Sequence, residues 1–127
     1  FIIDHLSIAV RELKTSARFY DALLKPLGIM RLSEAPKTIG YGKSYPEFWL
    51  NERPQLTPQP EDSGLHICLR APDAAAVDAF HAAAVSAGAK SDGPPGKRPQ
   101  YSQTYYAAFV RDWDGNRIEA VTFLRDT

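Results

Sequence analysis

Two short segments of the chain show the same alternation of apolar and polar side chains. In residues 5–10, leucine, isoleucine and valine fill every second position, and His5 is one of the residues between them. Residues 65–70 repeat the pattern around His66. A period of two is typical of a β-strand with one buried face. We expect the apolar face of each strand to pack on a helix, and the histidine face to line a cavity.

A helical pattern follows each strand. Glu12 and Asp73 stand where the two helices begin, and Asp73 is the better N-cap of the two. Gly28 and Gly88 are placed to end the helices. The first helix has a strong apolar stripe, formed by Phe19, Tyr20, Leu23, Leu24 and Leu27. The second has a weaker stripe, formed by Val77, Phe80 and Ala84.

Three shorter strands complete each half of the chain. We expect them at residues 30–33, 38–41 and 47–50, and again at residues 89–91, 105–111 and 116–123. Asp114 and Gly115 give a strong hairpin signal between the last two strands. Residues 53–63, which contain three prolines, form the expected linker between the halves.

The two halves resemble copies of one unit. At an offset of 61 residues, the matching pairs are His5 with His66, Glu12 with Asp73, and Phe19 with Phe80. Several matches in one order at one offset indicate an internal repeat. We therefore predict an α+β fold in which residues 1–127 form a single domain. Its two βαβββ modules, residues 1–52 and 64–127, would be related by pseudo-twofold symmetry.

Charge and composition narrow the classes of function. The chain of 127 residues has 15 basic and 15 acidic residues, and this balance argues against nucleic acid as a partner. No apolar run is long enough to span a membrane, and no secretory signal pattern is visible. Cys68 is the single cysteine, which excludes an internal disulfide framework and fits a reducing cytoplasm.

His5, His66 and Glu119 are the candidate metal ligands. The histidines hold equivalent places in the two modules, and Glu119 is a lone carboxylate among apolar residues of the last strand. A charge left unpaired there would be costly, so a metal ion or a cationic group would compensate it. Two histidines and one carboxylate suit Fe, Mn, Zn or Ni as divalent ions with open coordination positions. The alternative is that all three are ordinary surface or core residues.

Other side chains are expected to line the same site. Ser7 and Cys68 each follow a histidine by two positions and share its face of the strand. Trp49 occupies in the first module the place that Glu119 holds in the second, where it would form an apolar wall. We interpret Cys68 as a lining residue rather than a nucleophile, since no signal of a lowered thiol pKa is visible.

Residues 93–104 form the longest expected loop of the second module, and long loops in compact domains are often functional. The polar candidates within and just after it are Lys97, Arg98, Tyr101, Tyr105 and Tyr106. The loop is either a solvated, proline-stiffened surface segment or a lid over the site. As a lid, it would bring Arg98 or Lys97 to an anionic substrate group, and a tyrosine would donate a hydrogen bond. We assign catalytic roles to Glu119, Tyr105 and Arg98.

These segments together resemble the vicinal oxygen chelate superfamily, which includes glyoxalase I, extradiol dioxygenases, fosfomycin-resistance enzymes and bleomycin-resistance proteins. The resemblance covers essentially the whole chain. It rests on Asp4–Val10, on Phe19-Tyr20 before Leu27-Gly28, on Gly64–Ile67, and on Phe109–Glu119. The last segment is similar to the family signature Asp-Pro-Asp-Gly-Asn…Glu, with Trp113 in the place of the usual proline.

The resemblance implies that the paired modules close a cup-shaped mixed β-sheet around a metal site with ligands at His5, His66 and Glu119. Glyoxalase I normally has a fourth ligand, where this chain has Trp49. Extradiol dioxygenases use two histidines and one carboxylate, but they usually carry four modules. Homodimers are common in the family. The linker permits a site within one chain, or one in which His5 comes from one chain and His66 and Glu119 come from the other.

We therefore expect a cytoplasmic, homodimeric metalloenzyme of glyoxalase-like lyase or isomerase type, or of extradiol dioxygenase type. Its substrate would be a small molecule that chelates a divalent metal through adjacent oxygens, with contacts from Ser7, Trp49, Cys68, Lys97, Tyr101 and Tyr106. One alternative is a non-catalytic drug- or metabolite-binding protein of the same fold. Another is a structural domain in which the three ligands are a relic. Neither nucleic acid nor membrane is an expected partner.

Overall fold

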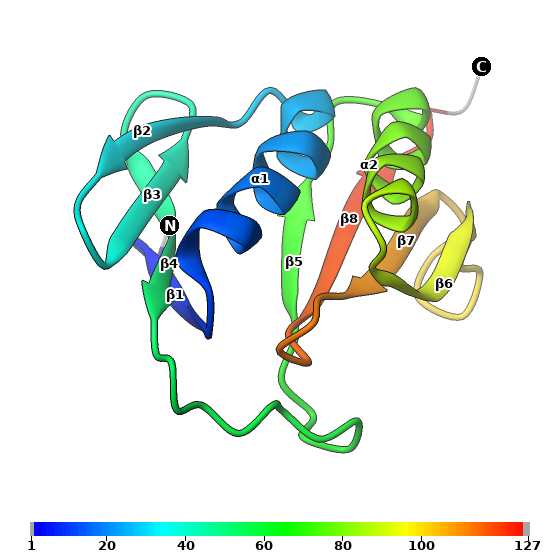
Figure 1. Cartoon of the computed structure of the whole chain (residues 1–127). Coiled ribbons are helices and arrows are strands. Elements are labelled where there is room, and N and C mark those ends of the chain that lie inside the picture. Colours follow the sequence, from blue (N-terminus) through cyan, green and yellow to red (C-terminus); the bar gives the residue numbers. More distant parts are fainter. Residues whose placement is uncertain (1, 126–127) are drawn as a thin grey trace.

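The computed structural model describes residues 2–125 as two successive βαβββ units (Figure 1). The first unit consists of β1 (Leu6–Val10), α1 (Leu13–Leu24), the short 3-10 helix η1 (Lys25–Leu27), β2 (Met30–Glu34), β3 (Thr38–Gly42) and β4 (Pro46–Glu52). The second consists of β5 (Ile67–Arg70), α2 (Ala74–Ser86), β6 (Lys90–Lys97), β7 (Tyr105–Arg111) and β8 (Arg117–Phe123).

The two units have the same topology. Their four-stranded sheets have the orders β1-β4-β3-β2 and β5-β8-β7-β6. In each sheet the first strand pairs in parallel with the last, and the other pairs are antiparallel. The predicted α+β fold with two equivalent modules is confirmed. β1 and β5 are edge strands of separate sheets, so residues 2–125 of one chain do not form a single continuous sheet.

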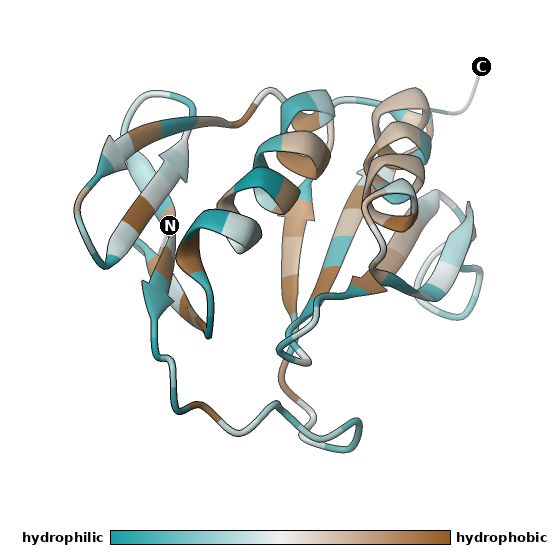
Figure 2. Cartoon of the chain, in the orientation of Figure 1, coloured by the Kyte–Doolittle hydropathy of each residue, from teal (hydrophilic) through white to brown (hydrophobic). Residues whose placement is uncertain are grey.

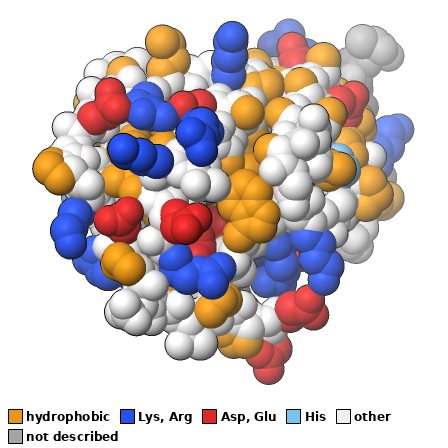
Figure 3. All heavy atoms as spheres, in the orientation of Figure 1, with side chains coloured by type: hydrophobic (Ala, Val, Ile, Leu, Met, Phe, Trp, Pro, Cys, Tyr) orange, Lys and Arg blue, Asp and Glu red, His pale blue; other side chains and the backbone are white. Residues whose placement is uncertain are grey.

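Both helices lie on one side of the two sheets and contact each other (Figure 1). The predicted stripe of α1 and its counterpart on α2 are buried in one core, together with the apolar faces of the strands (Figure 2). The outer surface on this side mixes acidic, basic and apolar side chains (Figure 3), in keeping with the zero net charge. Within residues 2–125, no helix has the length and apolar character needed to cross a membrane.

The helix ends follow the sequence signals in part. Asp73 caps α2 as predicted, because its side chain accepts a hydrogen bond of 2.9 Å from the amide of Ala76. Glu12 does not cap α1 with its side chain. Instead, Glu52 at the end of β4 accepts the amide hydrogen of Leu13 at 3.1 Å. A residue of the neighbouring strand therefore accepts the hydrogen bond of a first-turn helix amide, which a local N-cap side chain usually accepts.

Strand β6 is longer than the sequence predicts. The expected strand ended at residue 91, but β6 continues through Gly93, Pro94 and Pro95 to Lys97. Only residues 98–104 remain a loop, so the predicted loop at 93–104 is wrong in its first half. Prolines are tolerated because β6 is an edge strand, where a missing amide donor costs little. Irregular pairing with β7 around Gly93 accommodates the departure from a regular ladder.

The turn between β7 and β8 ties the second module to the first. Arg11, just after β1, donates its backbone amide and its Nε to Asp114 Oδ1, at 3.2 and 2.7 Å. Asn116 donates its side-chain amide to the carbonyl of Ala9 at 2.9 Å. The side chains of Asp114 and Asn116 are buried, so these polar bonds are shielded from water. The signature turn therefore has a structural role.

Tyr20 belongs to the same contact between modules, and its burial is expected to make the folding stability depend on pH. Its ring is fully buried, and its hydroxyl donates to Asp112 Oδ2 at 2.6 Å. Burial, followed by the nearby Asp112 carboxylate, raises the pKa of Tyr20 well above its ordinary value near 10. Above pH 10 the unfolded chain therefore loses a proton that the folded chain keeps. Folding stability must then fall as the pH rises, by up to about 1.4 kcal/mol per pH unit.

This dependence can be measured by urea unfolding between pH 8 and pH 11. We expect Tyr20→Phe to be less stable at pH 8, because its hydroxyl bond is lost, and to have a shallower alkaline decline. Tyr101→Phe serves as the control, since Tyr101 is 60% exposed. Equal alkaline slopes for Tyr20→Phe and the wild-type protein would contradict the assignment.

Candidate metal centre

Glu119 is the centre of the candidate site. It lies in the middle of β8 on the sheet face that points away from α2, and its side chain is only 2% exposed. His66, which immediately precedes β5, places its Nε2 3.0 Å from Glu119 Oε1. The hydroxyl of Tyr105, at the start of β7, donates to Glu119 Oε2 at 2.5 Å. The carboxylate therefore has one imidazole and one phenol as partners.

Tyr105 and Cys68 keep their protons beside Glu119 at neutral pH. Desolvation, and then the hydrogen bond to Glu119, raise the pKa of Tyr105 above its ordinary value. Desolvation and the Glu119 charge also raise the pKa of the Cys68 thiol to about 12. Cys68 is paired with Glu119 across β5 and β8. A protonated thiol is a poor nucleophile, which agrees with the interpretation of Cys68 as a lining residue.

His5 lies apart from this cluster in the single chain. Its Nδ1 is 2.7 Å from Asp4 Oδ2, and both side chains are exposed. Tyr45 also donates to Asp4, and these two contacts lower the pKa of the Asp4 carboxyl, with Tyr45 the larger cause. Among residues 2–125, no three histidine, cysteine, aspartate or glutamate side chains converge on a point suited to a metal ion. One chain therefore brings together His66 and Glu119 but not His5.

The direction of the strands explains this separation. β1 and β5 run in opposite directions in Figure 1, so equivalent positions of the two modules lie at opposite ends. His5 lines a cavity of about 420 Å³ together with Cys68 and Arg70 of β5. His66 instead lines a small recess beside Ile8 of β1. The sequence expectation that both histidines face one cavity is therefore not met within a single chain.

Ser7 and Trp49 lie on the equivalent open face of the first sheet. They are paired across β1 and β4, and Ser7 is exposed two positions after His5, as expected from the strand period. The Trp49 ring lies over Gly40, where an added Cβ would come within 2.9 Å of the indole. Gly40 therefore lets the indole lie close to the sheet, and Trp49 forms a flat apolar wall of module 1.

The loop after β6 places Arg98 and Tyr101 on the Glu119 face. The Arg98 guanidinium donates to carbonyl groups of its own segment, including Pro94 at 2.8 Å, and lies 5.6 Å from the centre of the Phe109 ring. The Tyr101 ring packs edge-on against Tyr105, with centroids 5.0 Å apart. These contacts bring the loop beside the candidate site.

Tyr106 and Lys97 lie on the opposite face, and their expected substrate contacts are not supported. Successive residues of a strand point to opposite sides, so Tyr106 points away from Glu119 when Tyr105 points towards it. The Tyr106 hydroxyl donates to Asp78 of α2 at 2.6 Å. Lys97 is the cross-strand partner of Tyr106 and shares its side of the sheet. Both residues therefore belong to the helix side of the second module.

Arg117 is a residue of the site that the sequence analysis missed. It precedes Glu119 by two positions on β8, which puts both on one face. Its guanidinium lies 4.4 Å from the centre of the Phe109 ring, and its Nε donates to Asp92 at 2.6 Å. The His66 ring is 6.1 Å from the same phenylalanine. The two-residue spacing from Glu119 was the signal that could have identified it.

Comparisons with known proteins agree with this architecture. Residues 2–120 match the model of the Glyoxalase/Bleomycin resistance protein/Dioxygenase superfamily. A solved glyoxalase/bleomycin resistance protein from Albidiferax ferrireducens T118 is 31% identical, with a TM-score of 0.83 over 95% of this chain and 98% of that one. No curated protein sequence matches the chain.

More distant structures share the fold. The genomically encoded fosfomycin resistance protein FosX from Listeria monocytogenes is 15% identical, with a TM-score of 0.69 over 94% of this chain and 90% of that one. A mutant form of FosX was solved with Mn(II) and 1S,2S-dihydroxypropylphosphonic acid. From the match to the family model and the 31% identical structure, the chain belongs to the Glyoxalase/Bleomycin resistance protein/Dioxygenase superfamily.

Proposed function

We propose that the protein is a cytoplasmic, metal-dependent enzyme of glyoxalase-like lyase or isomerase type, or of extradiol dioxygenase type. Its substrate would be a small molecule that chelates the metal through adjacent oxygens. The observation that carries this proposal is the buried carboxylate of Glu119, whose one ion-pair partner among residues 2–125 is His66. A buried carboxylate without a lysine or arginine partner is costly, and a cation beside it recovers that cost. The Mn(II) bound by FosX supports a metal in this fold.

The donor set fits a divalent ion. Glu119 and His66 already lie within hydrogen-bond distance of each other and offer one oxygen and one nitrogen ligand. We place His5 of a second copy as the third ligand, because His5 cannot join this pair within its own chain. The edge positions of β1 and β5 leave both strands available to a partner chain. The proposed enzyme is therefore a homodimer with two shared sites.

A divalent ion at this position would supply Lewis-acid polarisation of a substrate oxygen. The residues of the chain would orient the ligands and bind the substrate. Tyr105 keeps its proton, so its hydroxyl can orient Glu119 or, by releasing that bond, donate the same hydrogen to a substrate oxygen. Trp49 offers an aromatic wall, and Cys68 and Ser7 leave room for the substrate because their side chains are small.

The charges around Phe109 support a substrate with an anionic group. Arg98 and Arg117 both lie over this ring, and the centre of the His66 ring is 6.1 Å from its centre. Arg117 shares Asp92 with Arg111, so one carboxylate faces two guanidinium groups. A substrate could then present its chelating oxygens at Glu119 and its anionic end at the arginines.

A second candidate function is the binding of a small molecule without catalysis. The observation in its favour is the aromatic cluster beside Glu119. Tyr105 packs edge-on against both Tyr101 and Phe123, with centroids 5.0 and 5.4 Å apart. Such a surface suits an aromatic drug or metabolite whether or not a metal is bound. Retention of ligand binding after complete metal removal would favour this function over the enzymatic one.

Metal titration tests the enzymatic proposal. Apo protein is titrated with Mn(II), Fe(II), Zn(II) and Ni(II), and the bound metal is quantified by elemental analysis. We expect about one ion per chain for the wild-type protein, and at least a hundredfold weaker binding for His66→Ala, because a ligand is lost. His81→Ala is the matched control, since His81 lies on α2 and its ring contacts Ser91. Equal affinity for His66→Ala and His81→Ala would reject the site.

Mixing two variants tests whether the site is shared between chains. His5→Ala and Glu119→Ala are each expected to bind metal poorly. If His5 comes from the second copy, a mixed dimer contains one intact site and one lacking two ligands. The mixture should then recover up to a quarter of the wild-type metal content, because half of the dimers are mixed and each has one of two sites intact. No recovery after subunit exchange, or a monomer by light scattering, would contradict the shared site.

A further inference from the structure

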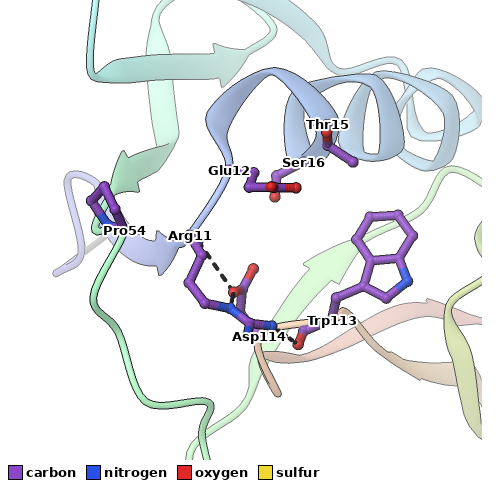
Figure 4. Close-up of a pocket in the computed structure, with 7 residues that line it drawn as sticks. All are labelled: Arg11, Glu12, Thr15, Ser16, Pro54, Trp113 and Asp114. Atoms are coloured by element: carbon purple, nitrogen blue, oxygen red, sulfur yellow. Dashed lines mark hydrogen bonds and ion pairs between the residues drawn. The ribbon is translucent and has the colours of Figure 1, made fainter.

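A separate cavity lies on the helix side of the molecule, where β1 leads into α1 and the β7–β8 turn approaches (Figure 4). Its volume is about 580 Å³. It is lined by Arg11, Glu12, Thr15, Ser16, Pro54, Trp113 and Asp114. None of these residues belongs to the proposed metal site. The lining combines both modules and the segment after β4, so an occupant would bridge all three.

The lining has more negative than positive charge. Asp114 is buried, and both of its bonds from Arg11 are accepted by the single oxygen Oδ1. The other carboxylate oxygen of Asp114 points into the cavity on the side of Glu12 (Figure 4). Glu12 forms no ion pair within residues 2–125. Asp114 is thus paired with Arg11, and the exposed Glu12 leaves the lining with one net negative charge, which a monovalent cation would balance.

The start of α1 does not reverse this preference. A helix N-terminus carries a partial positive charge that would favour an anion. Here Glu52 accepts the first helix amide, at Leu13, and places a third carboxylate at that end of the helix. The Ser16 amide is already bonded to the carbonyl of Glu12. With these two amides occupied, the net negative charge of the lining side chains favours a cation.

Trp113 gives the cavity an aromatic wall. Its ring stands at the opposite end of the cavity from Pro54 (Figure 4) and packs on Phe19, with centroids 5.1 Å apart. The residue remains 41% exposed, although it sits in a tight turn. An indole face attracts organic cations more strongly than other aromatic side chains do. An indole is not a ligand for a hard metal ion, which would prefer a shell of oxygens.

We propose that this cavity binds a small organic cation, such as an alkylated amine, between the Glu12 and Asp114 carboxylates and the Trp113 ring. Arg11 illustrates the fit, because its own guanidinium donates to Asp114 and to the Trp113 carbonyl, the latter at 2.6 Å. The hydroxyls of Thr15 and Ser16 offer further acceptors. The ligand would contact both modules and stabilise their arrangement.

The test uses choline as a cationic probe and 3,3-dimethylbutan-1-ol as its neutral isostere. Trp49→Phe leaves Trp113 as the single tryptophan of the 127-residue chain, so its fluorescence reports on this cavity. Titrations are done in EDTA, which makes the result independent of the proposed metal site. We expect saturable binding of choline and at least tenfold weaker binding of the neutral alcohol.

Two variants locate the binding. Glu12→Gln is expected to weaken choline binding at least tenfold. Trp113→Ala is expected to abolish choline binding, which is measured by calorimetry because this variant lacks the reporting tryptophan. Glu61→Gln is the control, because Glu61 is exposed and pairs with Lys90 away from this cavity. Equal affinity for choline and the alcohol, or an unchanged affinity in Glu12→Gln, would overturn the proposal. Saturable Ca²⁺ binding without choline binding, measured in His66→Ala protein, would also overturn it.

Discussion

Saturating the wild-type protein with its metal, at a thousand times the dissociation constant, is expected to raise the free energy of unfolding by about 4 kcal/mol. The same addition should leave Glu119→Gln almost unchanged. Glutamine keeps the size of the side chain but removes the charge that an ion would need. Because Glu119 is buried, surface water cannot replace its contribution. The measurement is urea unfolding with and without the metal that binds in the titration.

Without metal, the wild-type protein should lose most of its advantage in stability over Glu119→Gln. Glu119→Gln is expected to lie within about 1 kcal/mol of the wild-type protein, because replacing a buried carboxylate removes a desolvation cost along with two hydrogen bonds. A loss of several kcal/mol in the metal-free variant would show that Glu119 is a structural residue. That result would remove the main support for the metal centre.

Replacing Asp112 by alanine is expected to destabilise the protein by about 3 kcal/mol or more. Asp112 is buried, and it accepts hydrogen bonds from the Tyr20 hydroxyl, the Asn116 side chain and the backbone amides of Asp114 and Asn116. Alanine would leave these donors without an acceptor inside the contact between the modules. Urea unfolding at pH 7 measures the effect.

Asp62→Ala is the matched control, because Asp62 is exposed in the linker. It should change stability by less than about 0.5 kcal/mol. Asp112→Asn should fall between the two, since an amide oxygen can accept only part of the same set of bonds. If Asp112→Ala cost no more than Asp62→Ala, the turn would not hold the modules together.

Local patterns predicted most of the elements correctly because their signals depend on near neighbours. The stripe of Tyr20, Leu23 and Leu24 and the Asp73 cap act within one or two helical turns. The length of β6 could not be predicted in this way. Glycine and proline at residues 93–96 usually indicate a loop, and they are accepted here because β6 is the edge strand of its sheet within residues 2–125.

The candidate site was only partly predictable for a related reason. His66 and Glu119 meet because β5 and β8 pair in parallel, and the sequence predicted the two residues as ligands of one metal ion without that pairing. The position of His5 depends on how the modules pack, and no local pattern encodes the direction of a symmetry axis. Tyr106 lies on the side of the sheet that faces α2. This position follows from the strand period alone, so it could have been predicted from the sequence.

The bonds from the β7–β8 turn to β1 have a consequence for how the chain reaches its native state. They join residues that are 103 and 107 positions apart, so the first module lacks these partners until most of the chain has been made. The hydroxyl of Tyr20 likewise lacks its hydrogen-bond acceptor until Asp112 has been synthesised. The N-terminal half would therefore leave the ribosome with an incomplete core. Its final packing would be post-translational, a step at which chaperones could act.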